Sequence, residues 1–73
     1  MSEKKLVRMA NQIATFFRHQ PDAQAIEATM QHIKDFWNPV MLREIFAHLD
    51  NGGMGLDPLA LKALQALREK TGR

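Results

Sequence analysis

The side chains in this sequence that could do chemistry are few and stand apart from one another. His19, His32 and His48 are the histidines, and none has a second histidine three or four residues away, the spacing that builds a metal site on a helix. His48 follows Glu44 by four residues, a spacing that favours a weak surface contact. Ser2 is the only serine, so a Ser-His-Asp triad has no nucleophile on a helix. These patterns predict three solvated histidines and no catalytic residue.

One glycine-rich segment, residues 50–55, combines an acid with three glycines, as phosphate-binding and calcium-binding loops do. A Walker phosphate-binding loop ends in Gly-Lys-Ser or Gly-Lys-Thr, whereas Gly55 is followed here by Leu56 and Asp57. A calcium loop needs alternating oxygen ligands and a closing glutamate, and the segment has neither. We therefore predict that the segment is a turn.

The composition of the chain indicates one small domain. It has 73 residues, of which 45% are hydrophobic and 25% are charged. There is no cysteine, which excludes disulfides and thiolate metal sites. No apolar run approaches the roughly 18 residues of a membrane span, and the first residues lack the apolar core of a secretory signal. We expect a cytoplasmic protein that does not bind membranes.

The charge of the chain gives little evidence for nucleic-acid binding. The formal net charge is +2 and the sequence pI is about 9.4. The lysines and arginines are spread along the chain and most are offset by nearby acids, whereas a phosphate-binding face has a dense basic stripe.

Apolar residues recur at three- and four-residue spacing, which predicts an all-α fold. We predict a bundle of four short helices, at about residues 3–19, 22–37, 39–51 and 58–70, in a single domain covering residues 1–73, with residues 71–73 as a frayed tail. The side chains expected to face inward from the first three helices are Leu6, Met9, Ala10, Ile13, Phe16 and Phe17, then Ile26, Met30, Ile33 and Trp37 with Phe36 at the edge, then Leu42, Ile45, Phe46 and Leu49.

The junction between the second and third helices has a strong local pattern. Asn38 is a typical N-cap, and Pro39 then occupies the first helical position with its φ already fixed. Trp37 lies just before the cap and Leu42 four residues after the cap, the spacing of a hydrophobic staple. This corner is therefore predicted to be a fixed structural element.

The segment between the third and fourth helices has a similar pattern. Residues 51–53, Asn-Gly-Gly, predict a Schellman-type helix end. Asp57 and Pro58 repeat the pairing of a cap with a proline, and Leu56 is spaced to pack on Leu61.

Apolar residues on the fourth helix spread over more than half of its circumference. One contact face would leave some of its leucines in water. One explanation is that alanines tolerate either environment and that Leu61 is one ordinary exposed leucine. The other is that the helix is sandwiched between its own domain and another chain.

Three blocks of the chain together resemble a known family. They are LVRMANQIATFF at residues 6–17, HIKDFWNPVM at 32–41 and GGMGLDPLALKAL at 52–64. They are similar to the small delta subunit of bacterial NAD-dependent formate dehydrogenases, the soluble multisubunit type that contains molybdenum or tungsten. The resemblance departs at Val40, where the motif has the form Phe-Trp-x-Pro-Arg-Met. If that arginine makes a partner contact in relatives, this chain must make the contact otherwise.

The resemblance implies a noncatalytic accessory subunit of a complex that oxidises formate to carbon dioxide and reduces NAD. Its partner would be the large catalytic subunit, and its role would be assembly or stability of the complex. The molybdopterin guanine dinucleotide centre, iron–sulfur clusters and flavin would belong to the larger subunits. The lack of cysteine agrees, because this chain cannot ligate an iron–sulfur cluster by thiolates. Molybdenum and tungsten, and a maturation or permanent role, stay open as alternatives.

We expect the partner-binding surface at the two motifs that carry the resemblance, although the same motifs could equally be structural. The expected contact residues are Trp37, Asn38, Pro39, Met41 and Arg43 at the corner, Gly53, Met54, Gly55 and Leu56 in the turn, and Leu61 on the fourth helix. The alternative function is a small helical nucleic-acid-binding or regulatory protein, although its helices offer few outward basic residues. A homo-oligomer of the isolated chain is compatible with the subunit function.

Overall fold

The computed structural model describes residues 2–71, and these residues contain four α-helices and no strand. The all-α prediction is confirmed. The first three helices end one or two residues earlier than predicted and the last ends one residue later, so that Thr71 is helical and the rest of the predicted tail lies outside the described residues. The helices are α1 (Glu3–Phe17), α2 (Asp22–Phe36), α3 (Pro39–Asp50) and α4 (Pro58–Thr71). Within the described part, none is long and apolar enough to cross a membrane.

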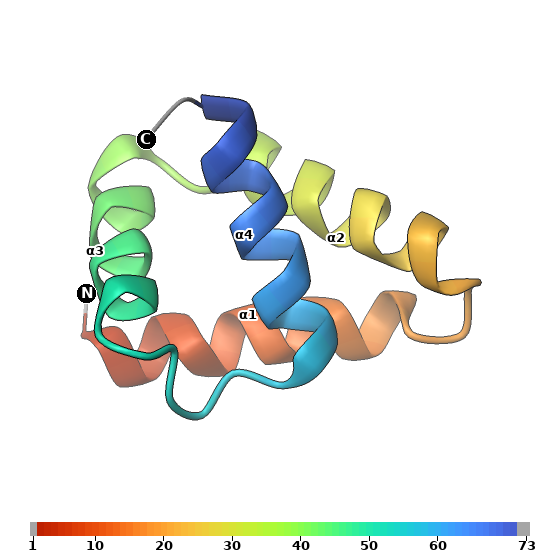
Figure 1. Cartoon of the computed structure of the whole chain (residues 1–73), viewed down its shortest axis with the longest axis horizontal. Coiled ribbons are helices and arrows are strands. Elements are labelled where there is room, and N and C mark those ends of the chain that lie inside the picture. Colours follow the sequence, from red (N-terminus) through yellow and green to blue (C-terminus); the bar gives the residue numbers. More distant parts are fainter. Residues whose placement is uncertain (1, 72–73) are drawn as a thin grey trace.

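Helices α1 and α2 diverge from the turn that joins them, and the other two helices complete the bundle around them (Figure 1). Helix α3 stands across the open end of this pair, and α4 crosses over both. Helix α4 makes its most extensive contacts with α2 and also packs on α1 and α3. The last helix in the chain is therefore the central one in the bundle.

The central place of α4 explains its wide apolar circumference. Ala60, Ala63, Leu64 and Leu67 are fully buried, and Leu59 and Ala66 are half-buried against the core. Leu61 is half-buried next to Gly53 of the turn. The chain's own core and turn thus cover the leucines of α4 fully or in part. A second chain is not needed to explain this pattern.

Two phenylalanines are exposed: Phe16, which was predicted to face inward, and Phe36, which was predicted to lie at the edge of the apolar face. Phe16 is 72% exposed and Phe36 is 73% exposed. The inward positions of α1 are taken by Leu6, Ala10 and Ala14, and two residues beyond Ala14 correspond to about 200° around the helix. Successive residues differ by about 100°, so Trp37 at the inward position leaves its neighbour Phe36 outside. The prediction of a core position for Phe16 is wrong.

Side-chain caps hold the starts of α1, α3 and α4, and the caps predicted at Asn38 and Asp57 are thereby confirmed. The backbone N–H of Lys5 donates to Ser2 Oγ at 3.3 Å, and that of Met41 donates to Asn38 Oδ1 at 2.9 Å. The N–H of Ala60 donates to Asp57 Oδ1 at 2.8 Å. Each side chain satisfies a donor that the helix itself leaves unpaired.

The predicted Schellman end of α3 is also confirmed. The N–H of Gly53 donates to the His48 carbonyl at 2.9 Å, and that of Gly52 donates to the Leu49 carbonyl at 3.1 Å. Gly53 has a φ of +65° and is buried, and a Cβ there would lie 3.1 Å from Leu61 Cδ1. The positive φ therefore favours glycine here, and any larger residue would also push the end of the Leu61 side chain aside by a few tenths of an ångström.

Substitution of Trp37 tests its place in the core. Trp37 is 6% exposed and belongs to the buried cluster with Leu6 and Ile33. Trp37→Ala should lower the free energy of unfolding by about 3–5 kcal/mol, because it leaves a cavity that the neighbours fill only in part. Phe36→Ala, the matched control on the adjacent exposed aromatic, should change it by about 0.5 kcal/mol or less. Urea unfolding followed by far-UV circular dichroism measures both, and equal effects would contradict the assignment.

Candidate functional site

An apolar groove lies between α1, α2 and the start of α3, and α4 contributes no side chain to it. Its volume is about 500 Å³. The lining carries no carboxylate and no lysine or arginine, so it suits an apolar ligand or protein segment. We name it the aromatic groove, and its lining residues are Met9, Gln12, Ile13, Phe16, Phe17, His32, Phe36, Trp37 and Met41.

A row of four aromatic rings runs across this groove from one helix to the other. The ring centroids of Phe16 and Phe17 are 5.0 Å apart with an interplanar angle of 86°. His32 lies 6.1 Å from Phe17 and 4.6 Å from Phe36, again between ring centroids. These distances are those of favourable aromatic pairs. The row therefore forms one ordered surface, with Phe16 and Phe36 the most exposed of its rings.

The structure divides the predicted corner between two surfaces. Trp37 and Met41 line the aromatic groove, with Trp37 buried and Met41 half-buried. Pro39 and Arg43 instead line a separate depression between α3 and α4. Asn38 is exposed while its side chain caps α3. The structure therefore brings only two of the five corner residues to the aromatic groove.

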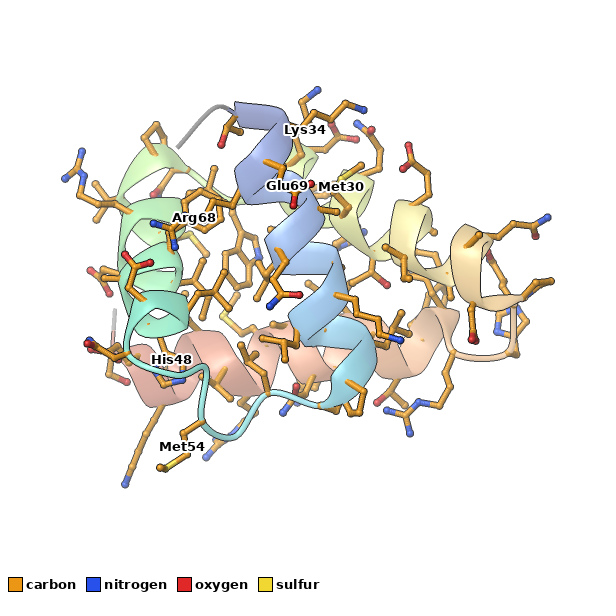
Figure 2. All side chains as sticks on the ribbon, in the orientation of Figure 1. Met30, Lys34, His48, Met54, Arg68 and Glu69 are labelled. Atoms are coloured by element: carbon orange, nitrogen blue, oxygen red, sulfur yellow. The ribbon has the colours of Figure 1, made fainter. Side chains whose placement is uncertain are left out.

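The residues of the predicted turn lie outside the aromatic groove. Met54 is 83% exposed and points away from the body of the protein (Figure 2). Gly55 is exposed, whereas Gly53 is buried and Leu56 and Leu61 are half-buried. Met54 is thus the one large apolar side chain that this turn presents to solvent.

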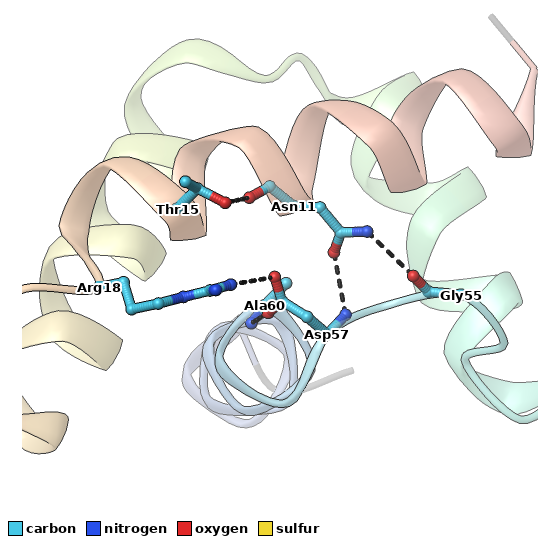
Figure 3. Close-up of polar contacts among 6 residues, drawn as sticks. All are labelled: Asn11, Thr15, Arg18, Gly55, Asp57 and Ala60. Atoms are coloured by element: carbon cyan, nitrogen blue, oxygen red, sulfur yellow. Dashed lines mark hydrogen bonds and ion pairs between the residues drawn. The ribbon is translucent and has the colours of Figure 1, made fainter.

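Asn11 of α1 holds the turn in place (Figure 3). Its Nδ2 donates to the Gly55 carbonyl at 2.9 Å, and its Oδ1 accepts from the Asp57 N–H at 3.0 Å. Asp57, the cap of α4, also pairs with Arg18 at 2.9 Å. One amide side chain therefore fixes the loop on both sides of Leu56. Sequence reasoning missed Asn11, because its two partners lie more than 40 positions away.

An ion pair and a cation–π contact join α3 to α4 near the depression that Pro39 and Arg43 line. The guanidinium of Arg68 makes a two-point ion pair with the Asp50 carboxylate and donates to the Phe46 carbonyl at 3.2 Å. It also lies 5.8 Å from the centroid of the Phe46 ring. The hydrogen bond from Arg68 lowers the pKa of Asp50. Figure 2 shows Arg68 between α3 and α4, away from the turn that joins α1 to α2.

His48 is held between two acceptors, and the prediction of a solvated side chain is wrong for it. Its side chain is 15% exposed. Its Nε2 lies 2.7 Å from the Met54 carbonyl, and its Nδ1 lies 2.8 Å from Glu3 Oε2. A carbonyl and a carboxylate both require an N–H, so the doubly protonated ring satisfies both contacts. Hydrogen bonding to Met54 and then to Glu3 raises the pKa of His48 above its ordinary 6.5.

The raised pKa of His48 predicts a pH-dependent stability. A group whose pKa is higher in the folded state contributes stability that is present below the unfolded pKa and is lost as pH rises through the folded pKa. Between pH 6 and pH 8.5, the free energy of unfolding of the wild type should therefore fall relative to that of His48→Ala. Urea titrations of both proteins at the two pH values give the difference in free energy of unfolding between wild type and variant at each pH. Taking this difference removes the contributions of other titrating groups, which both proteins share. A difference that grows with pH would contradict the assignment.

The described residues offer an apolar surface on which a protein segment could bind. Among residues 2–71, no three histidine or acidic side chains come together as a metal site. These residues form an apolar groove with a row of aromatic rings, and a turn that exposes Met54. Asn11 and Arg68 make polar contacts that join the elements of the bundle. Large exposed apolar side chains that gather in one place are typical of protein–protein contact sites.

Comparison with known proteins identifies the family. The family model of the NADH-dependent formate dehydrogenase delta subunit, FdsD, matches residues 5–64. This range covers most of the 73-residue chain and includes every lining residue of the aromatic groove and the whole turn. No curated protein and no solved structure matches the chain significantly. The match over most of its length shows that the chain belongs to the FdsD family of NADH-dependent formate dehydrogenase delta subunits.

Proposed function

We propose that this chain is a noncatalytic accessory subunit that binds the large catalytic subunit of formate dehydrogenase through the aromatic groove and supports assembly or stability of the complex. The observation that carries the proposal is the exposure of Phe16 and Phe36 in one ordered row of rings. Family membership supplies the partner, because a delta subunit associates with the catalytic subunits of its complex.

The energetics of the groove support a protein partner. Full burial of one phenylalanine side chain is worth about 1.5–3 kcal/mol relative to its exposure. Covering Phe16 and Phe36 together would thus contribute several kcal/mol toward the cost of association. Met9 and Met41 in the lining can adapt their unbranched side chains to the shape of the partner.

The proposed role in stability follows from the size of the domain. A chain of this length buries only about 60% of its unfolded surface, so its core supplies a small margin. A partner that binds the folded state alone stabilises that state by mass action. Association would thus stabilise the folded state of this chain and hold the chain in the assembled complex.

The proposed division of labour leaves the redox cofactors to other subunits. The residues of this chain do not fit an iron–sulfur cluster, because the sequence has no cysteine thiolate to ligate iron. We therefore assign the molybdopterin guanine dinucleotide centre, the iron–sulfur clusters and the flavin to the partner subunits. No step of formate oxidation is assigned to residues of this chain.

Removal of the two exposed rings tests the proposed function. The tagged catalytic subunit is co-expressed with the other subunits of the complex and with either the wild-type chain or a Phe16→Ser, Phe36→Ser double variant. Both the recovered chain and formate-dependent NAD reduction are measured. The two rings together should contribute at least about 2 kcal/mol to the free energy of binding. Their loss should therefore raise the Kd for the catalytic subunit about 30-fold or more. The variant should keep its fold, since both side chains are exposed.

Two control variants locate the effect. Gln65→Ala changes an exposed side chain on α4 and should leave recovery unchanged. Met54→Ser removes the exposed apolar side chain of the turn, which is the other predicted contact. Loss of the catalytic subunit with Met54→Ser but not with the double variant would move the interface from the groove to the turn. Full recovery with all the variants would contradict both assignments.

A further inference from the structure

A positively charged surface adjoins the aromatic groove along α1. A shallow depression there is lined by Lys4, Val7, Arg8, Asn11, Gln12 and Thr15. Gln12 also lines the aromatic groove, so the two surfaces share an edge. We name Lys4 and Arg8 the basic shelf. Both are exposed, and within residues 2–71 neither forms an ion pair.

The basic shelf has a regular geometry. Lys4, Arg8 and Gln12 are four residues apart, so they follow one face of α1, with a rise of about 6 Å between successive members. The aromatic groove next to them carries no carboxylate, lysine or arginine. The combined surface is therefore apolar on one side of Gln12 and cationic on the other.

We propose that the aromatic groove and the basic shelf together bind one amphipathic helix of the catalytic subunit, whose apolar face enters the groove and whose flank carries acidic residues toward Lys4 and Arg8. This inference rests on the proposed function and names the element that the partner supplies. The positive shelf selects the acidic flank by charge complementarity. Carboxylates about one helical turn apart match the spacing of the two cations.

The fold also selects a helix over a strand as the occupant. Residues 2–71 contain no strand, so this part of the chain offers no sheet edge to which a partner strand could add. A groove between two helices is instead the site in which an amphipathic helix places its apolar side chains. Exposed rings on both α1 and α2 provide the walls against which such side chains pack.

Photo-crosslinking in the assembled complex tests which element of the partner occupies this surface. Gln12 is replaced by the photoreactive residue benzoylphenylalanine, the chain is co-expressed with the catalytic subunit, and mass spectrometry identifies the crosslinked peptide. The expected product is an acidic amphipathic segment of the catalytic subunit. The same probe at Gln65, exposed on α4, is the matched control.

A complex that forms and crosslinks from Gln65 but not from Gln12 would overturn this inference and leave the proposed function standing. If the unmodified chain recovers no catalytic subunit, the proposed function itself fails.

Charge reversal tests the acidic flank separately. Lys4→Glu with Arg8→Glu should lower the association rate constant with the purified catalytic subunit at least tenfold at low salt, and the difference from wild type should shrink as salt is added. Lys34→Glu with Lys62→Glu makes the same change in net charge on other exposed faces and should have little effect. Equal effects of the two pairs would overturn the acidic flank. Aromatic rings beside cations also bind unpaired bases, so a labelled single-stranded oligonucleotide is tested as well. The acidic flank would also be overturned if the wild type bound this oligonucleotide more tightly than the catalytic subunit and the shelf variant abolished that binding.

Discussion

The position of α4 depends on the hydrogen bonds that Asn11 makes across the bundle. Asn11 fixes the Gly55 carbonyl and the Asp57 N–H to α1, and Asp57 in turn begins α4. Helix α4 supplies Leu64 and Leu67 to the buried cluster and contacts all three other helices. The amide thus sets the point from which the central helix starts. Both polar atoms of its side chain are used, so a substitution that keeps only the donor or only the acceptor would hold the loop at one point instead of two.

The sequence predicted the elements that depend on local chemistry. The caps at Asn38 and Asp57 and the glycine end of α3 were predicted because each partner lies within six residues. The aromatic groove and the contacts of His48 were not predicted, because they depend on which segments the fold brings together. His48 meets Glu3 across 45 positions. A local signal for the groove was nevertheless present, since adjacent aromatics such as Phe16 and Phe17 differ by about 100° on a helix and point in different directions.

The inward face of α1 explains why the groove exists. At Ala10 and Ala14 this face is small, which lets neighbouring helices approach closely, while larger side chains lie beside it. Alanine and phenylalanine are both common in protein cores, so the buried Ala14 is ordinary. Phe16 is the departure, because its exposed ring gives up apolar burial that would stabilise the isolated domain. The proposed function accounts for the two exposed phenylalanines, because a partner that binds the aromatic groove would cover both rings.

Trp37 connects the stability of the domain to its binding surface. Its ring is buried with Ile33 in the core and also lines the floor of the aromatic groove, so one side chain supports both. A change at Trp37 would alter folding and binding together and would not separate them. Phe16 and Phe36 differ, because most of their surface contacts solvent and their removal leaves the core intact. The fold therefore keeps the residues that present the groove distinct from the residue that supports it. The motif containing Trp37 is conspicuous in the sequence because its cap and its proline act locally, whereas the exposed rings are the surface that we propose for binding.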